Sequence, residues 1–70
     1  MENRIRELRQ KNNISQMELS KITGISLEDL IAIENNQIEV TLLDANRIAR
    51  ALNQKFIADV FLLDELKHDF

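Results

Sequence analysis

The sequence contains no cysteine, no proline and a single glycine, Gly24, among its 70 residues. The absence of cysteine excludes disulfides, thiolate metal sites and thiol nucleophiles. A small all-β domain with several tight turns would need more glycine and proline than this, and no strand-like alternation of apolar and polar residues is present. The composition therefore predicts an all-α protein whose helices are joined by short polar loops.

Long apolar runs are also lacking. None approaches the ~18 residues needed to cross a bilayer, and the opening Met1-Glu2-Asn3-Arg4 is not followed by the apolar core of a signal peptide. We therefore expect a cytoplasmic protein. The hydrophobic fraction of 44%, mostly Ile and Leu, is sufficient for one packed core, so residues 1–70 are expected to form a single domain.

Positive charge is scarce in the middle of the chain. The formal net charge is −3, which is unexpected for a protein that binds nucleic acid. Residues 1–21 are net basic and residues 47–70 are balanced, whereas residues 22–46 contain five carboxylates and no Lys or Arg. The acidic middle segment is the main argument against binding to DNA phosphates.

Helix boundaries are indicated by capping patterns. Three helices are predicted to begin at a hydroxyl residue with an acid three positions later, namely Ser15 with Glu18, Ser26 with Asp29 and Thr41 with Asp44. Asn12-Asn13 is expected to end the first helix and Gly24 the second, because Asn and Gly tolerate the left-handed conformation. Ile14 is expected to point inward.

Apolar residues at spacings of three and four predict the buried faces. These residues are Ile5 and Leu8 in the first helix, Leu19 and Ile22 in the second, Leu30 and Ile33 in the third, and Ala45, Ile48, Ala49 and Leu52 in the fourth. Residues 55–66 predict a short fifth helix followed by an apolar tail, with Phe56 and Phe61 in the core. One helical face cannot bury all the apolar residues of this segment, so the surplus predicts a self-association surface.

Residues 16–35 carry the diagnostic pattern of two short helices joined by a glycine-containing turn. Ser20 is small where the second of these helices must cross closely. The chain resembles the Cro/C1-type (XRE family) helix-turn-helix proteins over about residues 4–61. The matching segments are Ile5-Arg6-Glu7-Leu8-Arg9, Ile14-Ser15-Gln16-x-Glu18-Leu19-Ser20, Thr23-Gly24-Ile25-Ser26, Ile33-Glu34-Asn35, and Leu42 with Ile48-Ala49-Arg50-Ala51-Leu52.

This resemblance implies a lambda-repressor-like bundle of about five short helices. It also implies a sequence-specific transcriptional regulator, such as a repressor, whose third helix enters the major groove of double-stranded DNA. By position it assigns phosphate contacts to Gln16, Asn35 and the Gln37-Ile38 loop, and a structural ion pair to Arg9 and Glu34. The base-facing positions would be Ser26, Leu27, Glu28 and Ala32.

Family members often form homodimers through the C-terminal end, and two-fold symmetric operators require a dimer. The resemblance and the surplus of apolar residues together predict a homodimer interface. Its residues would be Phe61, Leu62, Leu63 and Leu66.

A second function remains open, because the family commonly has basic or polar residues where this chain has Leu27, Glu28, Ile31, Ala32 and Ile38. Glu28 has a simpler explanation than base contact, as a solvated carboxylate in the first turn of the third helix that interacts favourably with the helix dipole. The alternative is a protein-interaction module that uses Ile31 and Ile38 and has lost or weakened DNA binding. No residue pattern predicts a catalytic site, a metal site or a cofactor, so an enzyme is not expected.

Overall fold

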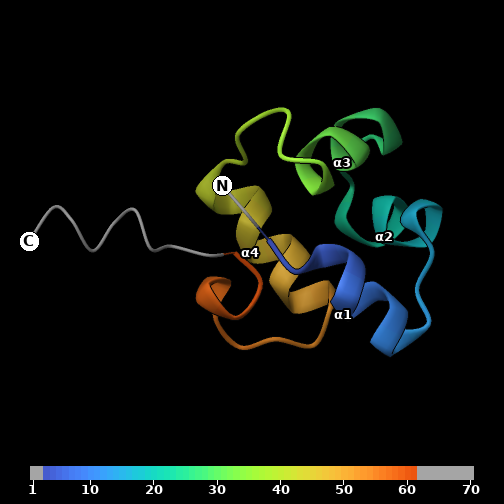
Figure 1. The fold of residues 1–70 in the computed structure, drawn as a ribbon, viewed down its shortest axis with the longest axis vertical. Helices are drawn as coiled ribbons and strands as arrows, with labels where there is room; N and C mark the ends of the chain where they lie inside the picture. The colour runs from blue at the N-terminus through green and yellow to red at the C-terminus, as the bar shows by residue number, and fades with distance from the viewer. Residues whose placement is uncertain (1–2, 62–70) are drawn as a thin grey trace, which may run out of the picture.

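The computed structural model describes residues 3–61, which form four α-helices and one turn of 3₁₀ helix (Figure 1). The helices are α1 (Ile5–Asn12), α2 (Gln16–Thr23), α3 (Leu27–Glu34) and α4 (Leu42–Ala51), and the 3₁₀ helix is η1 (Ile57–Asp59). Within this range no strand is formed, so the prediction of an all-α protein is confirmed. In the described part of the predicted fifth helix, only the 3₁₀ helix η1 forms, and residues 62–66 of that prediction lie outside the described residues.

The predicted helix starts are confirmed at atomic detail. The Ser15 hydroxyl accepts a hydrogen bond from the Glu18 amide at 3.0 Å, and the Glu18 carboxylate accepts one from the Ser15 amide at 3.0 Å. Ser26 and Thr41 cap α3 and α4 through their hydroxyls at 3.2 and 3.1 Å. These bonds satisfy amides that a helix leaves without a partner in its first turn.

The predicted helix ends are confirmed as well. Asn13 follows α1 with φ of 56° and Gly24 follows α2 with φ of 77°, both in the left-handed region. The amide of Gly24 donates to the carbonyl of Ser20 at 2.9 Å. A left-handed residue at this point reverses the chain direction, so that α3 can pack back against α2.

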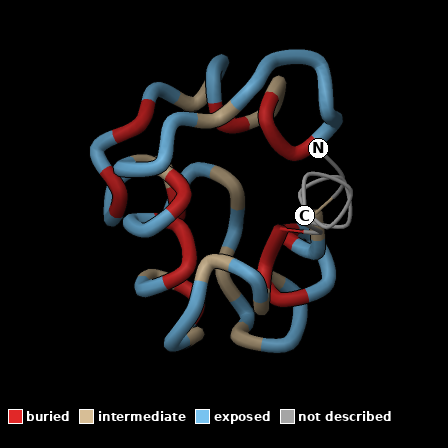
Figure 2. Tube along the Cα trace, turned by 90° about the vertical axis from the view of Figure 1, so that its left-hand side faces the viewer, coloured by how far each residue is buried: buried red, intermediate tan, exposed pale blue. Residues whose placement is uncertain are grey.

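One apolar core lies between the helices, and α4 contributes most to it. Figure 2 shows buried positions recurring along every helix between exposed ones. Helix α2 packs against both α3 and α4, and η1 packs against α4. The buried apolar residues are Ile5, Leu8, Leu19, Ile25, Leu30, Ile33, Ala45, Ile48, Ala49, Leu52, Val60 and Phe61, with Ile14 partly buried against them.

The segment before α1 connects the two ends of the described chain. The Arg4 amide donates to the Val60 carbonyl at 2.7 Å, and Asn3 forms an isolated antiparallel bridge with Phe61. The Asn3 side-chain amide also donates to the carbonyl of Ile33, the next-to-last residue of α3, at 3.0 Å. These contacts fix α1 between the end of α3 and the chain that follows η1.

Two core predictions are wrong. Ile22 is 61% exposed, and Thr23 occupies the buried position instead. The Thr23 hydroxyl donates to the Leu19 carbonyl at 2.7 Å and accepts from the Ile25 amide at 3.3 Å, so a polar side chain is buried without an unsatisfied group. Phe56 is 66% exposed because it precedes η1 in extended conformation, whereas Phe61 is buried as expected.

None of the helices between residues 3 and 61 combines the length and the apolar character that a membrane span requires.

Candidate nucleic-acid interface

The turn between α2 and α3 is held by side-chain hydrogen bonds from α2. The Ser20 hydroxyl donates to the Ile25 carbonyl at 2.5 Å, and Thr23 bonds the Ile25 amide. Both polar groups of the Ile25 backbone are therefore satisfied while its side chain is buried. A small hydroxyl residue at position 20 thus also fixes the chain that leads into α3, a role that the sequence analysis did not foresee.

Helix α3 buries one face and presents the other. Leu30, Ile33 and Glu34 face the interior. The residues to which the resemblance assigns base contacts lie outside this buried set: Ser26 and Glu28 are exposed, and Leu27 and Ala32 are half-buried. Ile31, half-buried, lies one turn after Leu27 on the same side of the helix. The predicted contact residues are therefore all at least partly accessible on α3 and its N-cap.

The loop after α3 is also on the surface. Asn35 and Gln37 are exposed, and Ile38 is 45% exposed, so the three residues that the resemblance assigns to phosphate contacts after α3 are accessible. The loop turns sharply because Asn36 adopts φ of 60°. The Asn36 side chain accepts a hydrogen bond from Asn3 at 3.1 Å, which ties the loop to the segment before α1.

Glu34 is bound from two helices. Nε and Nη2 of Arg9 both lie 2.9 Å from Oε1 of Glu34, and the Gln16 side-chain amide donates to Oε2. The Arg9 side chain is 13% exposed and that of Glu34 is 2% exposed. Arg9 additionally donates to the Ile14 carbonyl at 3.2 Å. This carboxylate therefore links α1, α2 and α3 and fixes the orientation of the proposed contact helix.

The position of Gln16 differs from that of a free phosphate ligand. It is the first residue of α2 and is half-buried, with its amide nitrogen directed at Glu34. Its backbone amide, like that of Met17, has no hydrogen-bond partner within residues 3–61. The start of α2 therefore offers main-chain donors and the positive end of the helix dipole to an anion.

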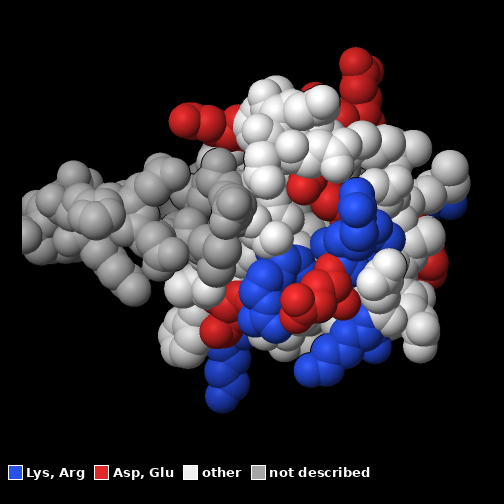
Figure 3. All heavy atoms as spheres, viewed as in Figure 1, with Lys and Arg blue, Asp and Glu red and all other residues white. Residues whose placement is uncertain are grey.

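Two of the five carboxylates in residues 22–46 are paired with arginines from outside that segment. Arg9 neutralises Glu34, and Arg47 lies 3.5 Å from Asp44. Glu28, Asp29 and Glu39 remain exposed. Figure 3 shows carboxylates projecting at the edge formed by α3 and the following loop, and Lys and Arg gathered over α1. Residues 22–46 are thus less acidic in the folded chain than the sequence suggests, although they supply no cation themselves.

Two ionisable side chains have shifted pKa values with clear causes. The hydrogen bond from the Ser15 backbone amide has the largest effect in lowering the pKa of the Glu18 carboxyl. The hydrogen bond with the Ser15 side chain lowers it further. The hydrogen bond to Glu7 raises the pKa of Arg4, whose guanidinium lies 2.5 Å from that carboxylate. Among the described residues no group of three or more His, Asp or Glu side chains is placed to hold a metal ion.

The predicted dimer residues are only partly described. Phe61 is 1% exposed within the domain, so its side chain is not available to a second chain as predicted. Leu62, Leu63 and Leu66 lie outside the described residues. A different apolar surface is present: Leu42, Leu43, Asn46 and Ile57 line a cleft of about 570 Å³, which we call the apolar cleft. Leu42 is 77% exposed there.

Comparison with known proteins identifies the family of the chain. Relatives of similar length include two archaeal proteins named as uncharacterized HTH-type transcriptional regulators. The one from Methanothermobacter thermautotrophicus is 41% identical over 61 residues, covering 87% of this chain and 88% of the relative. The one from Archaeoglobus fulgidus is 40% identical over 65 residues, covering 93% and 90%.

A bacterial relative with the same type of name, from Bacillus subtilis, is 35% identical over 65 residues, which cover 93% of this chain and 97% of the relative. Residues 3–62 match the family described as the helix-turn-helix domain. This match spans all four helices and η1. The chain therefore belongs to the helix-turn-helix domain family.

Proposed function

We propose that this protein is a transcriptional regulator of the Cro/C1 type that binds double-stranded DNA sequence-specifically, with α3 in the major groove. The main support is the exposed surface of α3 and its N-cap, where Ser26, Leu27, Glu28 and Ala32 are at least partly accessible. Arg9 and Gln16 fix this helix through Glu34. The names of the relatives support a regulatory role.

The chemistry of this face permits base readout with few charges. Glu28 can accept a hydrogen bond from a cytosine amino group, and Leu27 and Ala32 can contact the methyl group of thymine. The backbone amides at the start of α2, with Gln16, would contact one phosphate, and Asn35 and Gln37 another. Few phosphates would be neutralised, so we propose a shallow dependence of affinity on salt.

The test is selection of bound duplexes from a random pool at low salt, followed by measurement of their affinities. A variant with Leu27→Ala and Glu28→Ala should change the selected sequence, because these side chains would read bases. The matched control is Arg50→Gln, an exposed change on α4 that should leave the sequence preference intact. Failure of the wild-type protein to enrich any sequence would contradict the proposal.

We further propose that the protein acts as a homodimer, because regulators of this kind bind two half-sites about one helical turn apart. The apolar cleft is the support within the described residues, since Leu42 and Leu43 are exposed beside Ile57. Leu43→Lys should convert a dimer to a monomer in sedimentation velocity. Ile22→Lys, which adds the same charge at an exposed isoleucine of α2, should not. A wild-type monomer at all concentrations would refute the dimer.

The exposed carboxylates favour a second candidate function, a protein-interaction module. Glu28, Asp29 and Glu39 are exposed, and Ile31 and Ile38 add accessible apolar area in the same part of the chain. Such a surface suits a basic protein partner better than a polyanion. This candidate predicts no retardation of any duplex at low salt, together with binding of a basic partner that Ile38→Lys abolishes. Retardation of DNA would exclude it as the sole function.

A further inference from the structure

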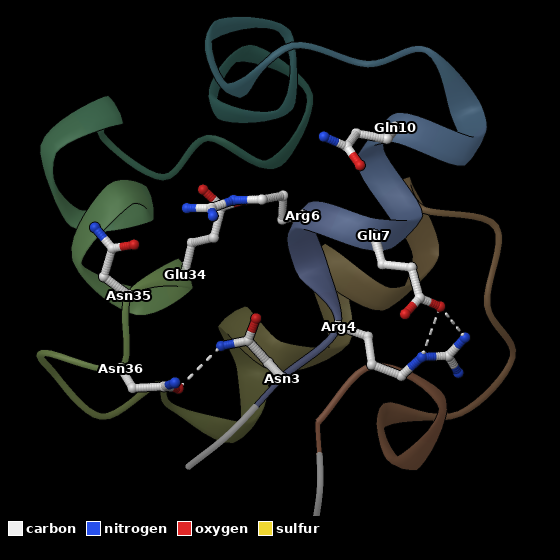
Figure 4. Close-up of a pocket in the computed structure, with 8 residues that line it drawn as sticks. All are labelled: Asn3, Arg4, Arg6, Glu7, Gln10, Glu34, Asn35 and Asn36. Carbon is white, nitrogen blue, oxygen red and sulfur yellow. Dashed lines mark hydrogen bonds and ion pairs between the residues drawn. The ribbon is translucent and has the colours of Figure 1, made fainter.

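A polar cleft of about 500 Å³ lies between α1 and the end of α3 (Figure 4). Arg6 and Gln10 line it from α1, and Asn35 and Asn36 line it from the residues that follow α3. We call it the Arg6 cleft. The cleft adjoins the loop after α3 to which phosphate contacts are assigned, because Asn35 lines the cleft and is also the first residue of that loop.

Arg6 is the uncompensated charge in this cleft. Figure 4 shows its side chain extending from α1 toward α3, and within residues 3–61 it makes no hydrogen bond or ion pair. Arg4, by contrast, is bound to Glu7 and to the Asp59 carbonyl. Glu34 also borders the cleft, but Arg9 and Gln16 occupy its two oxygens. The charge that remains in the cleft is therefore positive.

Side-chain amides complete the donor set. In the described part of the chain the amides of Gln10 and Asn35 have no hydrogen-bond partner, and Asn36 uses only its oxygen, as acceptor from Asn3. Three amide NH₂ groups and one guanidinium that have no partner among residues 3–61 thus border a single cleft, whereas the donors of Asn3 and Arg4 are already bound. An anion with several acceptor oxygens suits such a set, and guanidinium binds phosphate particularly well because its planar donors match two oxygens.

We propose that the Arg6 cleft binds a backbone phosphate of the duplex, with Arg6 as the cation and Gln10, Asn35 and Asn36 as neutral donors. The proposal rests on the function proposed above. It also accounts for an otherwise missing element, because residues 22–46 contain no Lys or Arg and phosphate contacts supply most of the affinity for DNA. Arg6 on α1 would thus provide the positive charge that α3 and its flanking loops lack.

The first test compares Arg6→Gln with Arg50→Gln on a selected duplex over a range of salt concentrations. Both variants remove one exposed charge, and neither side chain has an ion-pair partner among the described residues, so both should fold. Arg6→Gln should lower the affinity by the same factor on all duplex sequences and reduce the slope of log K against log salt by about one. Equal slopes for the two variants would overturn the proposal.

The second test needs no DNA. Inorganic phosphate is titrated into the protein while the side-chain amide signals of Gln10, Asn35 and Asn36 are followed by NMR. They should shift in the wild type and in Arg50→Gln, and not in Arg6→Gln. Absence of a shift in the wild type would overturn the cleft as a phosphate site even if DNA binds elsewhere. Phosphate-induced shifts without any duplex binding would refute the proposed function and DNA as the source of the phosphate.

Discussion

The guanidinium of Arg9 and the carboxylate of Glu34 lie 2.9 Å apart although 25 residues separate them in the chain. The pair joins α1 to the last residue of α3, and Gln16 at the start of α2 binds the remaining carboxylate oxygen. Because three short helices meet at one charged group, the orientation of α3 depends on whether that charge is compensated.

Arg9→Ala is predicted to lower the free energy of unfolding by about 3 kcal/mol, because it leaves a buried carboxylate without its counter-charge. Urea denaturation measures the loss. The control is Arg47→Ala, which breaks the ion pair between Arg47 and Asp44. The side chains of Arg47 and Asp44 are 51% and 32% exposed, so this loss should be below about 1 kcal/mol. Equal losses in the two variants would contradict a special role for the Arg9–Glu34 pair.

Gln16→Glu is predicted to destabilise the domain by about 2 kcal/mol at neutral pH, because it replaces the donor to Glu34 with a second carboxylate. Any loss of DNA binding in this variant would therefore reflect folding as well as phosphate contact. Urea denaturation at neutral pH measures the loss. Gln16→Ala is the control, since it removes the donor without adding a charge, and an equal loss in the two variants would refute repulsion between the carboxylates as the cause.

The helix boundaries could be predicted from the sequence because they depend on local chemistry. Ser15 and Gly24 act through neighbours within a few residues, so the capping box and the left-handed turn follow from residue types alone. The Arg9–Glu34 contact is long-range. Only the resemblance to known proteins implied this ion pair. The local sequence pattern carries no information about which residues meet across the fold.

Predictions failed where apolar character alone was used to assign burial. Thr23 is buried instead of Ile22 because its hydroxyl finds two backbone partners, which an apolar periodicity cannot detect. After α4 the chain passes through a turn and η1 into the bridge with Asn3, so Val60 and Phe61 fill the core while Phe56 stays outside. The Arg6 cleft was not foreseen either, because its donors come from two distant segments.

Gly24→Ala is predicted to cost about 1 to 2 kcal/mol, which is the strain of placing a side chain at φ of 77°. Apart from Gly24 and its two chain neighbours, no heavy atom lies within 4 Å of the position that a Cβ would take, so steric clash with the rest of the fold does not contribute. Gly24→Asn is the matched variant, since Asn tolerates the left-handed region better and should lose less. Thermal or urea denaturation compares the two, and equal losses would argue against backbone strain as the cause.

Glu18→Gln is predicted to change how stability depends on pH. Hydrogen bonds with Ser15 lower the pKa of Glu18 in the folded state, so the ionised carboxylate stabilises the fold above the unfolded pKa. That contribution is lost as pH falls through the lowered folded pKa, because the proton then occupies the acceptor. Gln keeps a hydrogen-bond acceptor for the Ser15 amide but does not titrate.

The free energies of unfolding of wild type and Glu18→Gln, measured in urea at steps from pH 7 to pH 3, should therefore differ most at neutral pH, with the wild type more stable. The difference should diminish below the ordinary range of a glutamate, where the wild-type side chain is also neutral. A difference that stays constant over the whole range would show that the charge of Glu18 plays no part in the start of α2. The capping box would then act through hydrogen-bond geometry alone.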